Sequence, residues 1–190
     1  LDESGDVDIE EEIPDYPVNL FISRGGYFKK ITPQSLRMSG EHKLKDGDIM
    51  DASFEATNRT ELLFFTDKCQ VYKSRASDFS ETKASAMGEY IPVKLGFDPD
   101  ENVISMIPTT DYSGFMFLVF ENGKAAKVPL TVFQTKTNRK KLTKAFSDKS
   151  RLVRLFFIAD NADIMLTSTK GRAVVFNTAL VLPKTTRDTI

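Results

Sequence analysis

The sequence repeats a β-hairpin pattern four times, and this repeat constrains the fold more than any other feature. Each copy has an apolar stretch, a short polar turn and a second stretch that carries basic residues. The copies are NLFISRGGYFKKITP from Asn19, LLFFTDKCQVYKSRA from Leu62, MFLVFENGKAAKVPL from Met116 and IMLTSTKGRAVVFNT from Ile164. Aligned on the turn, Gly26, Cys69, Gly123 and Gly171 share one position, at separations of 43, 54 and 48 residues. The chain is therefore expected to be a repeat protein.

Another apolar stretch precedes three of the turns: IMDASFEA from Ile49, VISMIPT from Val103 and VRLFFIA from Val153. We expect each to join the hairpin that follows it, with residues 90–94 as a candidate fourth strand. The period is in the range of propeller blades, which bury their faces against neighbours. The sequence thus predicts an all-β, propeller-like domain over residues 18–190. It would contain about four four-stranded blades, starting near 18, 62, 115 and 164, in an incomplete ring with a truncated last blade.

Local patterns add detail to this prediction. Asn122-Gly123 and Lys170-Gly171 suit tight turns that need a positive φ, whereas Cys69 at the same position predicts a different turn type. Leu142 and Phe146 are four residues apart, which is compatible with a turn or two of helix in 137–146. Phenylalanines within the apolar runs are expected in the core; they are Phe64, Phe65, Phe117, Phe120, Phe156 and Phe157.

Composition excludes several classes of function. One histidine and one cysteine allow neither a disulfide nor a His/Cys zinc site. No nucleotide-binding glycine motif is present, and Arg24-Gly25-Gly26 is interpreted as a turn rather than a phosphate cradle. A Ser-His-acid triad would need His42, which lies in a polar loop and is expected at the surface. No apolar run approaches membrane-spanning length. We therefore expect that the chain binds no cofactor, no metal and no small-molecule substrate, and that it does not associate with a membrane.

Charge is unevenly distributed along the chain. Residues 1–17 hold eight acidic side chains and no Lys or Arg, which leaves the rest of the chain at +7. We interpret this acidic segment as a linker, and the alternative is a tail that competes with nucleic acid for a basic face. Residues 124–154 hold ten basic side chains against Asp148 alone. Because the hairpins repeat, their cations should form a belt suited to phosphate contacts with a curved duplex.

The candidate DNA-binding residues are Arg24, Lys29, Lys30, Arg37, Lys68, Lys73, Arg75, Lys124, Lys127, Lys136, Arg139, Lys140, Lys141, Lys144, Lys149, Arg151, Arg154, Lys170 and Arg172. Three other hypotheses remain. The basic residues could serve solubility alone, or dock an acidic protein onto a propeller-like interaction module. A small hydrolase is the weakest, because no catalytic residues are visible. Single-strand binding is disfavoured because the phenylalanines are expected in the core.

The segments GYFKKITP, LLFFTDKCQVYKSRA and STKGRAVVF resemble blade hairpins in the C-terminal domain of bacterial type IIA topoisomerase A subunits, those of DNA gyrase and topoisomerase IV. The lead-in EEIPDYPVNLFISRGGYFKKI is similar to the segment that joins the family's catalytic core to its first blade. The resemblance covers nearly the whole chain from about Glu11. It implies a β-pinwheel, a disc whose blades exchange strands and whose basic outer edge bends DNA.

The resemblance also implies partners and a location: double-stranded DNA, the ATPase B subunit, the rest of the A subunit, and the bacterial cytoplasm. The family's catalytic tyrosine belongs to the N-terminal core, and nothing around Tyr16, Tyr27, Tyr72, Tyr90 or Tyr112 resembles its surroundings. The resemblance therefore implies a non-catalytic, DNA-binding part of an ATP-dependent DNA isomerase.

One departure bears on the choice between the two enzymes. Gyrase A subunits carry a Gln-Arg-Arg-Gly-Gly-type box after the first hairpin, which supports full DNA wrapping. The corresponding stretch here is SLRMSGEHKLKDGD, in which only Arg37 and Gly40 correspond to the box. The departure favours a topoisomerase IV-like protein or a divergent gyrase, and the choice between them stays open.

Overall fold

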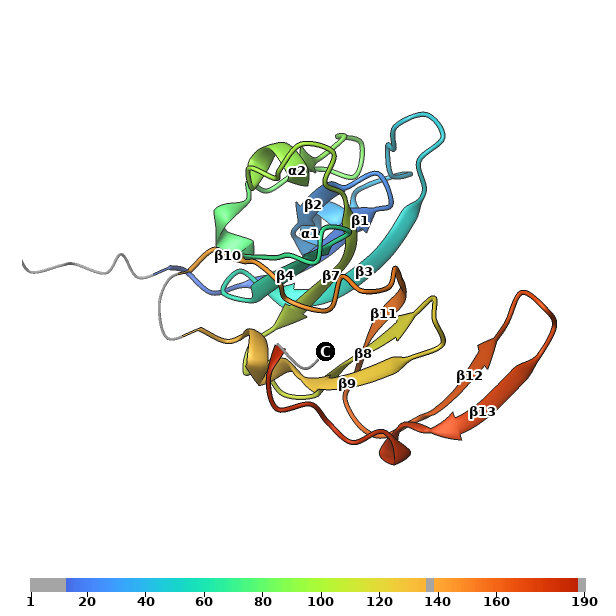
Figure 1. Cartoon of the computed structure of the whole chain (residues 1–190). Helices are drawn as coiled ribbons and strands as arrows, with labels where there is room; N and C mark the ends of the chain where they lie inside the picture. Colours follow the sequence, from blue (N-terminus) through green and yellow to red (C-terminus); the bar gives the residue numbers. More distant parts are fainter. Residues whose placement is uncertain (1–12, 136–138, 188–190) are drawn as a thin grey trace, which may run out of the picture.

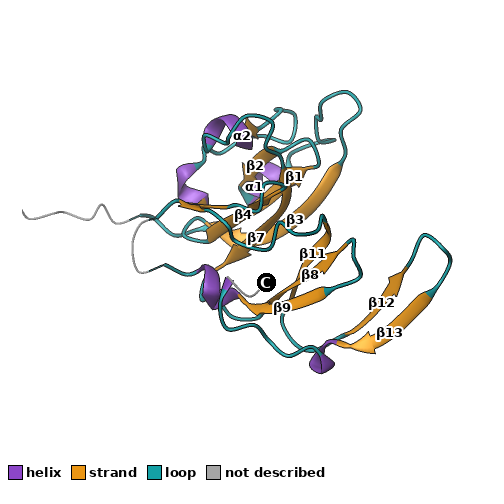
Figure 2. Cartoon of the chain, viewed as in Figure 1, coloured by secondary structure: helices purple, strands orange, loops and turns teal. Residues whose placement is uncertain are grey.

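The computed structural model describes residues 13–135 and 139–187, and four antiparallel β-sheets follow one another in an arc through it (Figure 1). Strands dominate, and the helices are single turns at the ends of strands (Figure 2). We call the sheets blades 1–4 in chain order. The predicted all-β architecture of repeated blades is confirmed.

The strand order within each blade departs from the sequence order. Blade 1 contains β3 (Met50–Thr57), β1 (Pro17–Ser23), β2 (Tyr27–Ile31) and β6 (Glu89–Tyr90), and blade 2 contains β10 (Lys141–Leu142), β5 (Val71–Arg75), β4 (Glu61–Thr66) and β7 (Val103–Thr109). Blade 3 contains β11 (Leu152–Ile158), β8 (Phe115–Phe120) and β9 (Ala125–Pro129), and blade 4 contains β12 (Asp163–Thr167) and β13 (Ala173–Asn177). Four strands per blade is therefore right for blades 1 and 2 only.

The blades exchange strands. β3 pairs with β1 along its whole length, and β7 and β11 pair in the same way with β4 and β8. Each of these strands belongs to the hairpin before it, so the prediction that it joins the hairpin after it was wrong. Apolar periodicity identifies a strand, but it does not say which neighbour supplies the backbone hydrogen bonds.

The opposite edge of a blade is also supplied from downstream. β6 follows the blade 2 hairpin in sequence but pairs with β2 in blade 1, and β10 follows the blade 3 hairpin but pairs with β5 in blade 2. Each of these blades is thus closed by segments on both sides of the next hairpin. Of the predicted strand at 90–94, only Tyr90 is extended. Residues 91–94 form α2 (Ile91–Lys94), since Pro92 sits in the first helical turn, where its missing N–H costs nothing.

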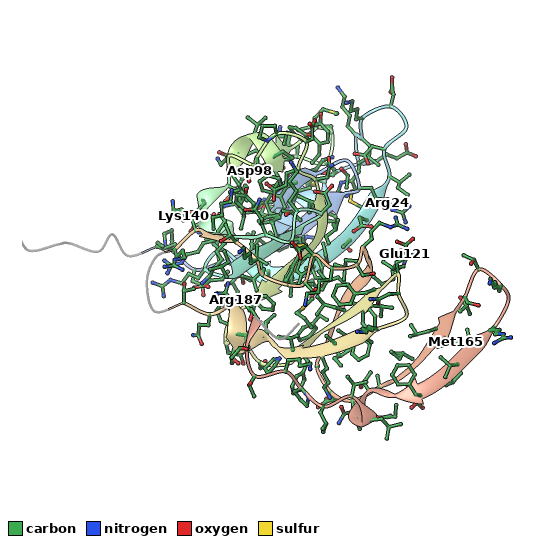
Figure 3. The ribbon with its side chains drawn as sticks, in the orientation of Figure 1. Arg24, Asp98, Glu121, Lys140, Met165 and Arg187 are labelled. Carbon is green, nitrogen blue, oxygen red and sulfur yellow. The ribbon has the colours of Figure 1, made fainter. Side chains whose placement is uncertain are left out.

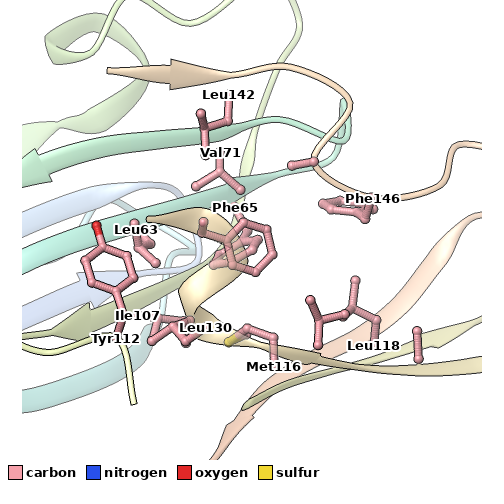
Figure 4. Packing of buried hydrophobic residues seen from close by; sticks show 14 of the residues in the cluster. Leu63, Phe65, Val71, Ile107, Tyr112, Met116, Leu118, Leu130, Leu142 and Phe146 are labelled. Carbon is pink, nitrogen blue, oxygen red and sulfur yellow. The ribbon is translucent and has the colours of Figure 1, made fainter. Parts of the chain in front are cut away.

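Alternating side chains of the hairpins in blades 2 and 3 pack against the blades on either side. Leu20 of blade 1 meets Phe64 of blade 2 in one core cluster, while the neighbouring Phe65 meets Leu118 of blade 3 in the next (Figure 4). Phe117 continues the series toward blade 4. The predicted phenylalanine core is thus largely confirmed; Phe156 is half-buried and Phe157 of β11 is exposed.

Two local predictions were wrong. Cys69 adopts a left-handed φ of 56°, and its N–H donates to the Thr66 carbonyl at 3.2 Å, so this turn is of the same kind as the one at Gly123. The segment 139–146 contains β10 rather than helix, and residues 136–138 lie outside the described residues. Leu142 is buried beside Val71 in this edge pairing, which accounts for the spacing that suggested a helix.

No helix in residues 13–135 and 139–187 is long and apolar enough to cross a membrane.

Gly88, which immediately precedes β6, tests how closely β6 packs against β2, and Gly123 in the β8–β9 turn is the control. A Cβ on Gly88 (φ +86°) would meet the Phe28 carbonyl oxygen of β2, whereas one on Gly123 (φ +80°) would meet nothing within 4 Å. Gly123→Ala should cost about 1–2 kcal/mol from backbone strain alone. Gly88→Ala should cost about 1–3 kcal/mol more, because β6 must move away from β2. Urea unfolding of both variants measures the difference, and equal losses would contradict the close contact.

Candidate functional site

Three of the predicted DNA contacts are buried. Lys29, Lys30 and Lys127 are each less than 5% exposed. The Lys29 ammonium donates to the backbone carbonyls of Lys43 and Ala84, at 2.7 and 2.8 Å. That of Lys30 donates to Asn58 Oδ1 at 2.9 Å, and that of Lys127 to Asn161 Oδ1 at 2.5 Å. These lysines are therefore internal hydrogen-bond donors and not surface cations, because the polar groups of neighbouring loops surround them.

One of these lysines recurs with the repeat. Lys30, Lys73 and Lys127 each lie four residues after the turn residue, and Val175 takes that place in blade 4. Lys73 is half-buried, donates to Thr135 Oγ1 at 3.1 Å and lies 5.3 Å from the centre of the Tyr112 ring. Burial lowers the pKa of both Lys30 and Lys73, although nearby carboxylates oppose the shift. The regular spacing thus places lysines between the blades rather than on a belt.

A groove lies where the outer edges of blades 1 and 2 meet. It has a volume of about 280 Å³ and is lined by Tyr72, Lys73, Ser74, Asp78, Lys94, Leu95 and Lys140. The lining thus includes three lysines and one aspartate, although the Lys73 ammonium is directed to Thr135 and the Tyr112 ring. Lys140 immediately precedes β10, and Lys94 ends α2. The groove is the place where the exchange of β6 and β10 brings cations from distant parts of the sequence together.

The cations of the groove differ in how they are held. The Lys94 ammonium pairs with Glu89 at 2.7 Å and lies 5.5 Å from the centre of the Phe79 ring. Lys140 is exposed and its ammonium has no partner among the described residues. The neighbouring Lys141 pairs with Asp98 at 2.9 Å, and this hydrogen bond, with a second to Tyr72, raises the pKa of Lys141. Lys140 is therefore the cation of the groove most available to an anion.

Other predicted cations lie at the hairpin turns, on the other side of the molecule from Lys140 (Figure 3). Arg24 pairs with Asp51 at 3.4 Å, and Arg151 pairs with Glu121 at 3.3 Å. Lys68 donates to the Pro99 carbonyl. Several of these charges are thus balanced by acids. The predicted belt is divided between a groove at the outer edge and a mixed-charge surface at the turns.

The remaining predicted cations are exposed. None of them has a described ion pair, and none lines the groove. They are Arg37, Arg75, Lys124, Arg139, Lys144, Lys149, Lys170 and Arg172. Arg154 lines a cleft at the inner edges of the blades, and Lys136 lies outside the described residues. Lys94 was missed from sequence, although its segment had been singled out as a candidate strand. Because residues 90–94 were interpreted as a strand, nothing in the sequence suggested that Lys94 lies near Lys73 and Lys140.

The inner cleft has a volume of about 530 Å³ and is walled by the exchanged strands. The register of each exchanged strand shifts by one residue, at Asp51, Ile104 and Val153. Such β-bulges turn the extra side chain out of the regular alternation, and all three residues line this cleft. Arg24 and Arg154 also line the cleft. Because Asp51 offsets one of these two positive charges, the net charge of the lining is small.

Comparison with known proteins shows what the fold and sequence resemble. Residues 60–110 match the family model described as DNA gyrase C-terminal domain, beta-propeller. The A subunit of DNA gyrase from Streptomyces coelicolor is 26% identical over 186 residues, which cover 90% of this chain and 22% of that protein. The corresponding protein of Clostridium acetobutylicum is 28% identical, over 94% of this chain and 22% of its own length. The chain is similar to the A subunit of DNA gyrase over most of its own length. It spans about a fifth of the length of these gyrase relatives.

Solved structures show the same fold. A crystal structure of the C-terminal domain of DNA topoisomerase IV matches with a TM-score of 0.79 at 22% identity, over 90% of this chain and 55% of that one. A structure of the DNA gyrase A C-terminal domain matches with a TM-score of 0.58 at 15% identity, over 89% of this chain and 57% of that one. The β-pinwheel implied by the sequence resemblance is confirmed. Domains of both enzymes thus share this fold.

Two lysines of one hairpin form a matched test of the buried donors. Lys127 is buried with partners, whereas Lys124 is exposed at the turn. Lys127→Met should lower the free energy of unfolding by about 1–3 kcal/mol, since the hydrogen bonds from the ammonium to Asn161 and to the Thr178 carbonyl are lost. Lys124→Met should change it by about 0.5 kcal/mol or less. Thermal or urea unfolding measures both, and equal effects would show that Lys127 has no structural role.

Proposed function

We propose that this chain binds duplex DNA without sequence preference, through the cations at the outer edges of its blades, and bends it. The observation that carries the proposal is the groove whose lining includes the exposed Lys94 and Lys140, on a domain similar to the gyrase A subunit. Phosphates are contacted by Lys and Arg regardless of base sequence, so a row of such sites along a curved edge favours a bent duplex.

The proposed contact surface is narrower than the sequence suggested. It retains Lys94 and Lys140 of the groove, together with Arg139 and Lys144, which are exposed on either side of β10 in sequence. It omits Lys29, Lys30 and Lys127, because these side chains are buried and their ammonium groups are held by internal hydrogen bonds. The half-buried Lys73 contributes to the potential of the groove while its own ammonium stays on Thr135.

We further propose that the chain acts as a non-catalytic part of the A subunit of a cytoplasmic, ATP-dependent type IIA topoisomerase. Its partners would be the ATPase B subunit together with the remainder of its own polypeptide. The names of the matched relatives and solved structures support this assignment. A supercoiling assay of the whole enzyme tests it. Loss of negative supercoiling on removal of this domain would indicate a gyrase, and decatenation without negative supercoiling would indicate topoisomerase IV.

Charge reversal tests the contact surface directly. The triple variant Arg139→Glu, Lys140→Glu and Lys144→Glu removes the exposed cations at and beside β10. It should weaken binding to duplexes of any sequence about equally, by roughly tenfold or more, because phosphate contacts carry no sequence information. Fluorescence anisotropy at fixed salt measures the affinity for several duplexes.

A second triple variant is the matched control for this charge reversal. Lys43→Glu, Lys45→Glu and Lys83→Glu make the same charge change at exposed lysines of other loops. Its affinity for DNA should fall much less than that of the first variant. Equal losses would mean that net charge, and not the outer edge, controls binding.

The salt dependence gives a second measurement. The logarithm of the affinity should fall linearly with the logarithm of the salt concentration, with a slope of about −0.9 for each phosphate neutralised. The triple variant at Arg139, Lys140 and Lys144 should reduce this slope, whereas Lys127→Met should leave it unchanged because Lys127 is buried. No retention of DNA by the wild-type chain at low salt would overturn the proposed function.

A further inference from the structure

Lys141 differs from its neighbour Lys140 in having a carboxylate partner, Asp98. We propose that the ion pair between Lys141 and Asp98 holds β10 against blade 2 and thereby positions Lys140 in the groove for phosphate contact. Lys141 and Asp98 are then positioning residues and not DNA contacts. The inference rests on the proposed function, because it names the residues that fix the geometry of the same site.

β10 is a short edge strand with few backbone hydrogen bonds. In the described residues it pairs with β5 only at Lys141 and Leu142, whereas β7, at the opposite edge of blade 2, pairs along the whole of β4. One further hydrogen bond, from the Lys73 N–H to the Lys140 carbonyl at 2.7 Å, extends the pairing toward the groove. Such an edge opens locally at low cost unless side chains hold it.

The two ends of β10 are held by different side chains. Leu142 is buried in the core between blades 2 and 3, and the N–H of Ala145 beyond it donates to a carbonyl of the β4–β5 turn at 2.8 Å. Lys141 lies at the other end, next to Lys140, and its ammonium donates to both carboxylate oxygens of Asp98 at 2.9 Å. The ion pair is thus the side-chain contact that fixes the end of β10 nearest Lys140.

The carboxylate of Asp98 is held in place independently of Lys141. An exposed ion pair is usually weak, because two flexible side chains must be ordered. Here the Gln70 amide donates to Asp98 Oδ2 at 2.8 Å, and the Asp98 N–H donates to Glu101 at 2.9 Å. Glu101 is itself buried and accepts hydrogen bonds from Gln70 and Tyr72 at 3.0 and 2.8 Å. The entropic cost of pairing therefore falls mainly on Lys141, whose ammonium also lies 5.2 Å from the centre of the Tyr72 ring.

The charge of Asp98 separates positioning from simple electrostatics. Asp98→Asn removes one negative charge and leaves the Lys141 ammonium without its carboxylate partner. Electrostatics alone therefore predicts that this variant binds DNA more tightly. Loss of positioning predicts the opposite, because Lys140 is then no longer held in the groove. The two effects thus have opposite signs in a single variant.

The affinity of the full chain for duplex DNA, measured by fluorescence anisotropy at fixed salt, is the first test. Asp98→Asn should weaken binding by roughly threefold or more. Asp100→Asn is the matched control, since Asp100 is exposed in the same loop, takes part in no ion pair among the described residues, and has a left-handed φ of 57° that asparagine tolerates. The control should bind as well as wild type or slightly better. Equal or tighter binding by Asp98→Asn overturns the proposal.

A double-mutant cycle tests whether the two residues act as a unit. Lys141→Met should also weaken binding, and the double variant with Asp98→Asn should bind no more weakly than Lys141→Met alone, because the pair is already broken. A double variant weaker than both single variants would show that the residues act separately, which contradicts the proposal.

Hydrogen exchange followed by NMR tests the position of β10 without DNA. The Lys73 N–H, which donates to the Lys140 carbonyl, should exchange roughly fivefold faster or more in Asp98→Asn. The Phe120 N–H, which donates to the Lys124 carbonyl in blade 3, should be unchanged. Unchanged exchange at Lys73 overturns the proposal. A wild-type chain that does not bind DNA would instead overturn the proposed function, and the exchange at Lys73 would still decide whether the ion pair holds β10.

Discussion

The architecture depends on one constraint, which is that blades 1 and 2 borrow both of their outer strands from the chain on either side of the next hairpin. β3 and β6 flank the blade 2 hairpin in sequence, yet both belong to blade 1. The backbone hydrogen bonds of one blade therefore hold the next blade in place. The apolar cores between blades form as a consequence, because the hairpins of blades 2 and 3 each pack one face against the blade before and the other against the blade after.

The same repeat explains why lysines are found inside the structure. A lysine recurs four residues after the turns of blades 1, 2 and 3, and oxygens of neighbouring loops accept its hydrogen bonds. Buried ammonium groups need such partners, since an unpaired one would be strongly unfavourable. In blade 4, which has no following blade among the described residues, valine takes the position.

The sequence predicted the repeat, the hairpins and the apolar core, because alternation and turn residues report local geometry directly. It did not predict strand exchange, since β3 looks the same whichever hairpin it joins. It also misjudged the burial of Lys29, Lys30 and Lys127, because the residue type carries no information about surrounding oxygens. The groove could not be predicted for a third reason. Its lining residues come from β5, α2 and the segment before β10, and they lie in one lining only after β6 has joined blade 1 and β10 has joined blade 2.

The borrowed strands also set the order in which the chain can fold during synthesis. Blade 1 has its first hairpin complete at Ile31, but its last strand is not present until Tyr90 has been made. By that point the whole blade 2 hairpin has been translated. Blade 2 in turn lacks its last strand, β10, until Leu142 has been made. Each of these two blades therefore spends a period on the ribosome with an exposed edge. Translation speed across the connecting segments, and not only the stability of the finished domain, then governs how much chain folds correctly.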